Sequence, residues 1–71
     1  MPATRHVPLP HLREWREHRL MSQAEVKDKT GLAIATISNL ENGKAEATYG
    51  TIAKLAEALG ISREQLVREK P

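Results

Sequence analysis

The sequence contains no cysteine and no phenylalanine, and it has one tryptophan and one tyrosine among 71 residues. Without cysteine, neither a disulfide framework nor a thiolate metal site can hold the fold together. No apolar run approaches the roughly 20 residues of a membrane span, and the N-terminus lacks the apolar core of a signal peptide. We therefore expect one small cytoplasmic domain with no membrane segment, which buries only about 60% of its unfolded surface.

The chain also has no large excess of either positive or negative charge. Eleven Lys and Arg residues against nine Asp and Glu residues give a formal net charge of +2. The first 22 residues carry this excess, and the basic and acidic residues of the remaining chain cancel. Bulk electrostatics therefore predict only a modest affinity for nucleic acid. Composition alone does not indicate a nucleic-acid-binding protein.

No set of residues suggests catalysis or a cofactor. Ser22, Ser38 and Ser62 have no histidine nearby in the expected helical arrangement. His11 and His18 are seven positions apart, which is about 10 Å along a helix and too far to share a metal ion. There is no phosphate-binding loop. We expect a protein that is not an enzyme and that binds no metal and no cofactor.

Residues 22–44, SQAEVKDKTGLAIATISNLENGK, predict two short helices joined by a tight turn. Ser22 can cap the first helix, and Gly31 can adopt the left-handed conformation that ends it. The second helix should span about residues 32–41, with Ile37 and Leu40 on one face. Asn42 and Gly43 should then end it in a turn. Two helices at this spacing are typical of a DNA-reading helix-turn-helix, here residues 22–42.

This stretch resembles the phage-repressor helix-turn-helix family, also called Cro- and lambda-repressor-like or XRE. Counted from Gln23 as the first core position, the family pattern is matched by Val26, Gly31, Ile37 and Leu40. The segments LENGK and AKLAEALGIS are also typical of the family. The resemblance covers about residues 12–67. It implies an all-α, compact five-helix domain of the lambda-repressor type.

Two residues depart from that family pattern. Lys27 stands where a small residue normally allows the two helices to cross closely, and Thr30 stands at a position that is usually apolar. The stem of a lysine can lie along apolar surface while its ammonium group stays in solvent. The crossing of the two helices could therefore be shifted rather than lost.

The remaining chain divides into an arm and a helical domain. Residues 1–9 lack periodicity and are expected to form a flexible basic N-terminal arm. Residues 10–69 should form the domain, without strands, with a first helix over residues 10–19 that buries Trp15. Leu20 stands where the family often has glycine, so some backbone strain is expected. Thr48 can cap a fourth helix ending at Leu59, and Ser62 can cap a fifth.

The second helix of the motif, about residues 32–41, is the recognition helix, which enters the major groove. It lacks arginine and lysine for bidentate pairing with guanine. Asn39 can instead pair with adenine, and apolar side chains can contact the thymine methyl group. The candidate base contacts are Ala33, Ile34, Ala35, Ser38 and Asn39. The candidate phosphate contacts are Gln23, Asn42, Lys44 and Arg5. The alternative for Asn39 and Lys44 is a solvated surface residue, for Gln23 a simple helix-start residue and for Ile34 core packing. For the arm that contains Arg5 the alternative is an ordinary frayed terminus.

The family resemblance implies one buried ion pair. An arginine at the position of Arg16 commonly pairs with the glutamate that ends the recognition helix, here Glu41. Breaking a buried pair by removing one partner is costly, because it leaves an unpaired charge in the interior.

The resemblance implies a sequence-specific transcriptional regulator, bacterial or phage-encoded and associated with the nucleoid, that binds double-stranded DNA as a repressor. The chain ends after the fifth expected helix, so we expect no C-terminal sensing or dimerising domain. A lone module of this size gives marginal specificity. A homodimer on a palindromic operator, formed through the fourth and fifth helices, is therefore expected. The alternative is a protein-interaction module or antitoxin whose helix-turn-helix mainly binds a second protein.

Overall fold

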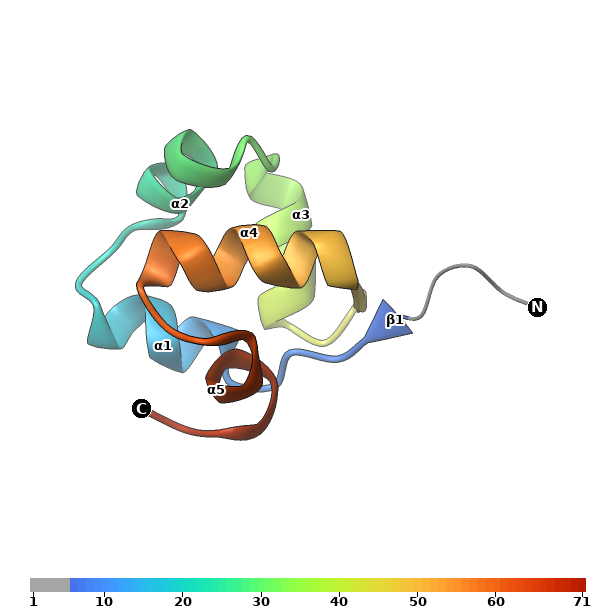
Figure 1. The fold of residues 1–71 in the computed structure, drawn as a ribbon. Coiled ribbons are helices and arrows are strands. Elements are labelled where there is room, and N and C mark those ends of the chain that lie inside the picture. The colour runs from blue at the N-terminus through green and yellow to red at the C-terminus, as the bar shows by residue number, and fades with distance from the viewer. Residues whose placement is uncertain (1–5) are drawn as a thin grey trace.

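The computed structural model describes residues 6–71, in which five helices and two short strands follow one another (Figure 1). In chain order these elements are β1 (His6–Val7), α1 (Leu12–His18), α2 (Gln23–Thr30), α3 (Ile34–Glu41), β2 (Ala47–Thr48), α4 (Tyr49–Leu59) and α5 (Arg63–Arg68). The expected five-helix architecture is confirmed. The expected absence of strands is wrong.

Helix α4 lies across the middle of the molecule, and α2 and α5 pack against it (Figure 1). Its apolar side chains recur at intervals of three and four residues, which places them on one face. Ile52, Leu55, Ala56 and Leu59 form this stripe, and none is more than 3% exposed. Burying such a stripe is the main favourable contribution to folding in a domain that has few aromatic residues.

Local sequence signals set the ends of the helices. Ser22 and Glu25 form a capping box at the start of α2, and Ser62 and Gln65 form one at the start of α5. Each box satisfies two backbone N–H groups that a helix N-terminus leaves without partners. Thr48 caps α4 by accepting a hydrogen bond from the backbone N–H of Thr51. These caps confirm the predicted starts of all three helices.

Trp15 joins α1 to α5. Its ring is buried, and the indole Nε1–H donates hydrogen bonds to the backbone oxygens of Gln65 at 3.2 Å and Glu69 at 2.8 Å. A buried indole needs such a partner, because its N–H would otherwise be desolvated without compensation. The prediction that the single tryptophan belongs to the core is confirmed.

The N-terminal segment differs from the sequence-based prediction. His6 pairs with Thr48 and Val7 with Ala47 in a two-stranded antiparallel sheet, and Leu9 is buried in the core. The predicted flexible arm over residues 1–9 is therefore wrong for residues 6–9, whereas residues 1–5 lie outside the described part of the chain. Strands of two residues show no alternation of polar and apolar side chains. Their pairing depends on a partner far along the sequence.

Two helices begin two positions later than predicted. The predicted helix over residues 10–19 is observed as Leu12–His18, and the predicted recognition helix over residues 32–41 is observed as Ile34–Glu41. Ala33 has the extended backbone angles of an N-cap residue, and the N–H of Leu32 donates to the Thr30 hydroxyl. The Leu32 side chain turns toward the core. The extended backbone at Ala33 therefore separates Leu32 from α3, which begins at Ile34.

Leu20 has a positive φ of 56° and is 89% exposed. The N–H of Leu20 donates to Glu17 O at 2.9 Å, and the N–H of Met21 donates to Arg16 O at 3.1 Å. These two bonds form a Schellman motif, whose residue after the C-cap is normally glycine. A Cβ atom in this left-handed conformation costs about 1–2 kcal/mol. The strain expected from the sequence at Leu20 is therefore present.

We predict that Leu20→Gly stabilises the fold by about 0.5–1 kcal/mol, because relief of the strain exceeds the extra chain entropy that glycine adds to the unfolded state. Urea unfolding would measure the change. Leu20→Ala is the matched control, since it removes the exposed side chain but keeps the Cβ atom. An equal gain in both variants would contradict the strain argument.

Candidate nucleic-acid interface

Helices α2 and α3 form the predicted helix-turn-helix. Val26 on α2 and Ile37 and Leu40 on α3 are buried, and they join the two helices to the core. Gly31 lies between the helices with φ of 77°, and its N–H donates to Lys27 O at 2.7 Å. Any side chain at Gly31 would be strained, although nothing lies within 4 Å of the position that a Cβ atom would take. Backbone conformation rather than space requires glycine here.

The two departures from the family pattern have local explanations. Lys27 is exposed, so its ammonium group stays in solvent while α2 and α3 remain in contact. The Thr30 hydroxyl donates to Val26 O at 2.7 Å and accepts from the N–H of Leu32 at 3.2 Å. The hydroxyl of Thr30 therefore has both a donor and an acceptor partner at the end of α2. A polar residue is thus tolerated at a usually apolar position.

The candidate base-contacting residues lie away from the core. Ala33, Ile34, Ala35 and Asn39 are exposed and Ser38 is half-buried. Ile34 is 41% exposed, so it is not part of the buried core. These five candidate residues thus offer methyl groups, one amide and one hydroxyl.

The side chain of Glu41 is fully buried and is the meeting point of three helices. Arg16 of α1 donates from Nε to Oε2 at 2.6 Å and from Nη2 to Oε1 at 3.1 Å. Arg13 of α1 and Gln23 of α2 also donate to Oε1, at 3.3 Å and 3.2 Å. The structure therefore brings together the two residues of the expected ion pair and adds two further donors. A bidentate Arg–carboxylate pair of this kind fixes orientation as well as contributing energy.

Burial of Glu41 acts to raise its pKa, because it penalises the charged form. The hydrogen bonds from Arg16, Gln23 and Arg13 and the positive charge of Arg16 outweigh this effect, so the pKa of Glu41 lies below its ordinary value. The hydrogen bond to Glu41 correspondingly raises the pKa of Arg16. The carboxylate is therefore ionised at neutral pH despite its burial.

The candidate phosphate-contacting side chains differ in how many of their hydrogen-bonding groups already have a partner in the protein. Lys44 is exposed in the turn after α3. Gln23 uses one amide hydrogen for Glu41, which leaves its second amide hydrogen for another acceptor. The Asn42 side chain accepts from Arg13 Nη2 at 2.8 Å and donates to Ser38 Oγ at 3.3 Å. Arg5 lies outside the described residues.

The candidate contact residues chosen from the sequence did not include two polar side chains of α1 and α3, Arg13 and Thr36. Arg13 is half exposed and bridges Glu41 and Asn42. Its position three residues before Arg16 places both on one face of α1, and this spacing was the available signal. Thr36 is exposed on α3. Nothing in its local pattern distinguishes it from a solvated helix residue.

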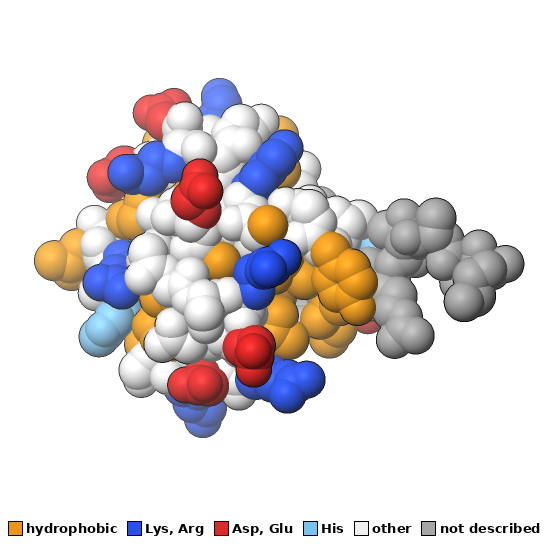
Figure 2. All heavy atoms as spheres, viewed as in Figure 1, with side chains coloured by type: hydrophobic (Ala, Val, Ile, Leu, Met, Phe, Trp, Pro, Cys, Tyr) orange, Lys and Arg blue, Asp and Glu red, His pale blue; other side chains and the backbone are white. Residues whose placement is uncertain are grey.

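Lys and Arg side chains are interspersed with Asp and Glu on the face that carries α4 (Figure 2). Apolar side chains gather on the same face beside the N-terminal end of α4 (Figures 1 and 2). The face with α4 therefore offers no large area of one charge.

The helix-turn-helix family model matches residues 12–66 of the chain, which include all five helices of the described part except the last two residues of α5. The chain belongs to the helix-turn-helix family. This helix-turn-helix protein is 36% identical over 52 residues to the uncharacterized HTH-type transcriptional regulator y4dJ of Sinorhizobium fredii, a match that covers 73% of this chain and 68% of that protein.

A solved structure is similar as well. The restriction-modification controller protein C.AhdI from Aeromonas hydrophila is 33% identical, with a TM-score of 0.74 over 78% of this chain and 83% of that chain. Together with the geometry of α2 and α3, these similarities show a DNA-binding transcriptional regulator of the XRE type. Within residues 6–71, no helix is long and apolar enough to cross a membrane, and no cluster of side chains could hold a metal ion.

We predict that Glu41→Gln destabilises the regulator by about 3 kcal/mol at pH 7, because the partly buried guanidinium of Arg16 loses its charged partner. The folded-state pKa of Glu41 is depressed, so the stabilisation is fully present above the unfolded pKa near 4.3 and is lost as pH falls through the lower folded pKa. The stability gap between wild type and Glu41→Gln should therefore narrow on acidification. Urea unfolding from pH 7 to pH 3 measures both effects.

The double variant Arg16→Met with Glu41→Leu serves as the control. It removes both charges of the pair, so it should recover much of the stability lost in Glu41→Gln. A gap that is small at pH 7, or that does not change with pH, would show that the pair contributes little.

Proposed function

We propose that this regulator reads an operator through the major groove with the exposed face of α3. The observation that carries the proposal is the contrast between the two faces of this helix. Its inner face holds Ile37, Leu40 and the fully buried Glu41, and its outer face is solvent-exposed. A helix held this rigidly can place a few side chains against base edges.

The chemistry of that outer face favours A·T base pairs. Asn39 can form a bidentate pair with adenine, and the methyl groups of Ala33, Ile34 and Ala35 can contact the thymine methyl. No arginine or lysine lies on α3, so the bidentate guanine contact has no donor within the helix. Lys44, Gln23, Asn42 and Arg5 would anchor the protein on phosphates, which supplies affinity but no base preference.

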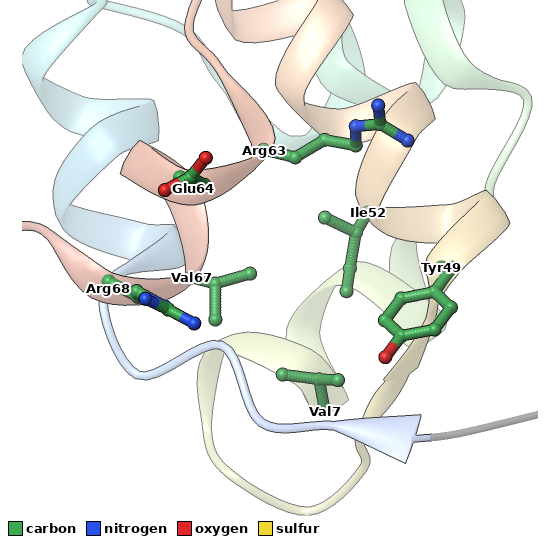
Figure 3. Close-up of a pocket in the computed structure, with 7 residues that line it drawn as sticks. All are labelled: Val7, Tyr49, Ile52, Arg63, Glu64, Val67 and Arg68. Atoms are coloured by element: carbon green, nitrogen blue, oxygen red, sulfur yellow. The ribbon is translucent and has the colours of Figure 1, made fainter.

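We further propose that two copies bind a palindromic operator, with half-sites about 10 base pairs apart. An apolar groove supports this, because residues of β1, α4 and α5 line it and no residue of α3 does. Figure 3 shows Val7, Ile52 and Val67 converging in the groove, with Tyr49 at its side. Tyr49 is 57% exposed. Arg63, Glu64 and Arg68 also line the groove, so opposite charges are available to pair across a two-fold axis.

Occupation of an operator by such a dimer would exclude other proteins from the same DNA, so we propose repression as the mode of regulation. The protein would act in the cytoplasm, on nucleoid DNA. A second protein partner in the same groove is the competing use of this surface. The oligomeric state of the pure protein separates the two uses, because a homodimer needs no added partner.

The first prediction contrasts a base contact with a phosphate contact. Asn39→Ala should relax the preference for adenine at one position in each half-site, by a factor that corresponds to about 1–3 kcal/mol. Lys44→Ala should weaken binding to all sequences equally and flatten the salt dependence by about one unit. Selection of DNA from a random pool, followed by titrations at several salt concentrations, would measure both variants.

Each variant is the control for the other. If selected half-sites were G·C-rich at the contacted positions, the assignment of α3 side chains to bases would be wrong. Binding that does not depend on salt would contradict phosphate contact altogether, because counterion release would then be absent.

The second prediction concerns the dimer. Tyr49→Asp should raise the dimer dissociation constant at least about tenfold, because a charge replaces an aromatic side chain in an apolar contact. The fold should be retained, since an acidic residue is favourable in the first turn of α4. Sedimentation equilibrium gives the dissociation constant. Leu20→Asp, which changes an exposed leucine that does not line the groove, is the matched control and should leave it unchanged.

A further inference from the structure

A line of hydrogen bonds connects α1 to the outer face of α3. Arg13 Nη2 donates to Asn42 Oδ1 at 2.8 Å, and Asn42 Nδ2 donates to Ser38 Oγ at 3.3 Å. Arg13 is held in place by its second contact, from Nε to Glu41 Oε1 at 3.3 Å. The line therefore begins at the buried carboxylate and ends at a hydroxyl on the recognition helix.

The direction of every bond in this line follows from one fact, that a guanidinium group can only donate. Asn42 must turn its oxygen toward Arg13, because its NH₂ group at 2.8 Å would place two donors against each other. The NH₂ group of Asn42 then faces Ser38 Oγ, which must accept. The amide orientation, which is ordinarily ambiguous, is thus determined by chemistry.

Accepting a hydrogen bond leaves the hydroxyl hydrogen of Ser38 for a different partner. The Thr30 hydroxyl donates its hydrogen to the carbonyl oxygen of Val26, four residues earlier. Ser38 makes no such bond to the backbone within residues 6–71. We propose that Arg13 and Asn42 are positioning residues that set the polarity of Ser38, so that Ser38 donates its hydrogen to an acceptor on a base edge.

The major-groove acceptors that distinguish one base from another are guanine O6 and thymine O4. The donors that Ser38 should disfavour are the amino groups of cytosine and adenine. A serine hydroxyl normally contacts either kind of group, because it can rotate. The hydrogen bonds from Arg13 to Asn42 and from Asn42 to Ser38 leave the Ser38 hydroxyl able to act only as a donor toward a base. This inference rests on the proposed reading of DNA by α3.

The decisive variant is Asn42→Asp. A carboxylate still accepts from Arg13, but it must also accept from Ser38, so the hydroxyl hydrogen turns inward. The outward lone pair of Ser38 then favours a base donor. We expect the preference at one position in each half-site to shift by about tenfold from guanine or thymine, whose O6 or O4 accepts, toward cytosine or adenine, whose amino group donates. The added negative charge should weaken binding to all sequences, but it cannot reverse a relative preference.

Three variants control the interpretation. Asn42→Ala leaves the hydroxyl free to rotate, and Arg13→Met frees Asn42 to flip, so both should relax the preference at this position without reversing it. Ser38→Ala with Asn42→Asp should show no preference there. Randomising the operator position by position and measuring the bound fraction of each base gives the result for every variant.

A measurement on the free protein tests the same bonds without DNA. The Arg13 guanidinium of the wild type should show separate Nη resonances in NMR spectra, because two contacts hinder its rotation, and Asn42→Ala should average them. Averaged resonances in the wild type would overturn the inference. Wild-type binding with a base preference that Asn42→Asp leaves unchanged would overturn it too and would leave DNA reading by α3 intact. A wild type that binds no DNA would overturn both.

Discussion

The buried carboxylate of Glu41 is the constraint on which the geometry of this domain depends. It collects donors from Arg13 and Arg16 of α1 and from Gln23 of α2, while belonging itself to α3. A carboxylate in the interior cannot remain ionised without such donors, because burial alone raises its pKa. The three helices must therefore meet in one arrangement. Any rotation of α3 that moved its outer face would also break these bonds.

This rigidity compensates for a surface that carries little charge. The formal net charge is +2, so long-range attraction to DNA is weak. In the proposed complex, discrimination between bases rests on short contacts from methyl groups, an amide and a hydroxyl of the candidate residues on α3. Such contacts require close placement of the helix, because each side chain reaches only one base edge. The polar network behind α3 and the apolar core beneath it provide that placement.

Most of the helices could be predicted from the sequence because their signals are local. Ser22, Thr48 and Ser62 each cap the helix that follows them. The candidate residues on α3 could likewise be placed on the outer face, because the spacing of Ile37 and Leu40 defines the inner one. The starts of α1 and α3 were predicted two positions too early. For α3, the residue before the helix, Ala33, has extended backbone angles, and Leu32 packs against the core.

The sequence by itself determined the helix-turn-helix and the left-handed turn at Gly31, because each depends on backbone preferences within a few residues. The family resemblance also implied the strain at Leu20 and the pairing of Arg16 with Glu41. Only the tertiary structure decided that Val7 lies in a strand opposite Ala47, and that Arg13 reaches both Glu41 and Asn42. These contacts join residues far apart in the chain, so signals within a few residues of sequence do not indicate them.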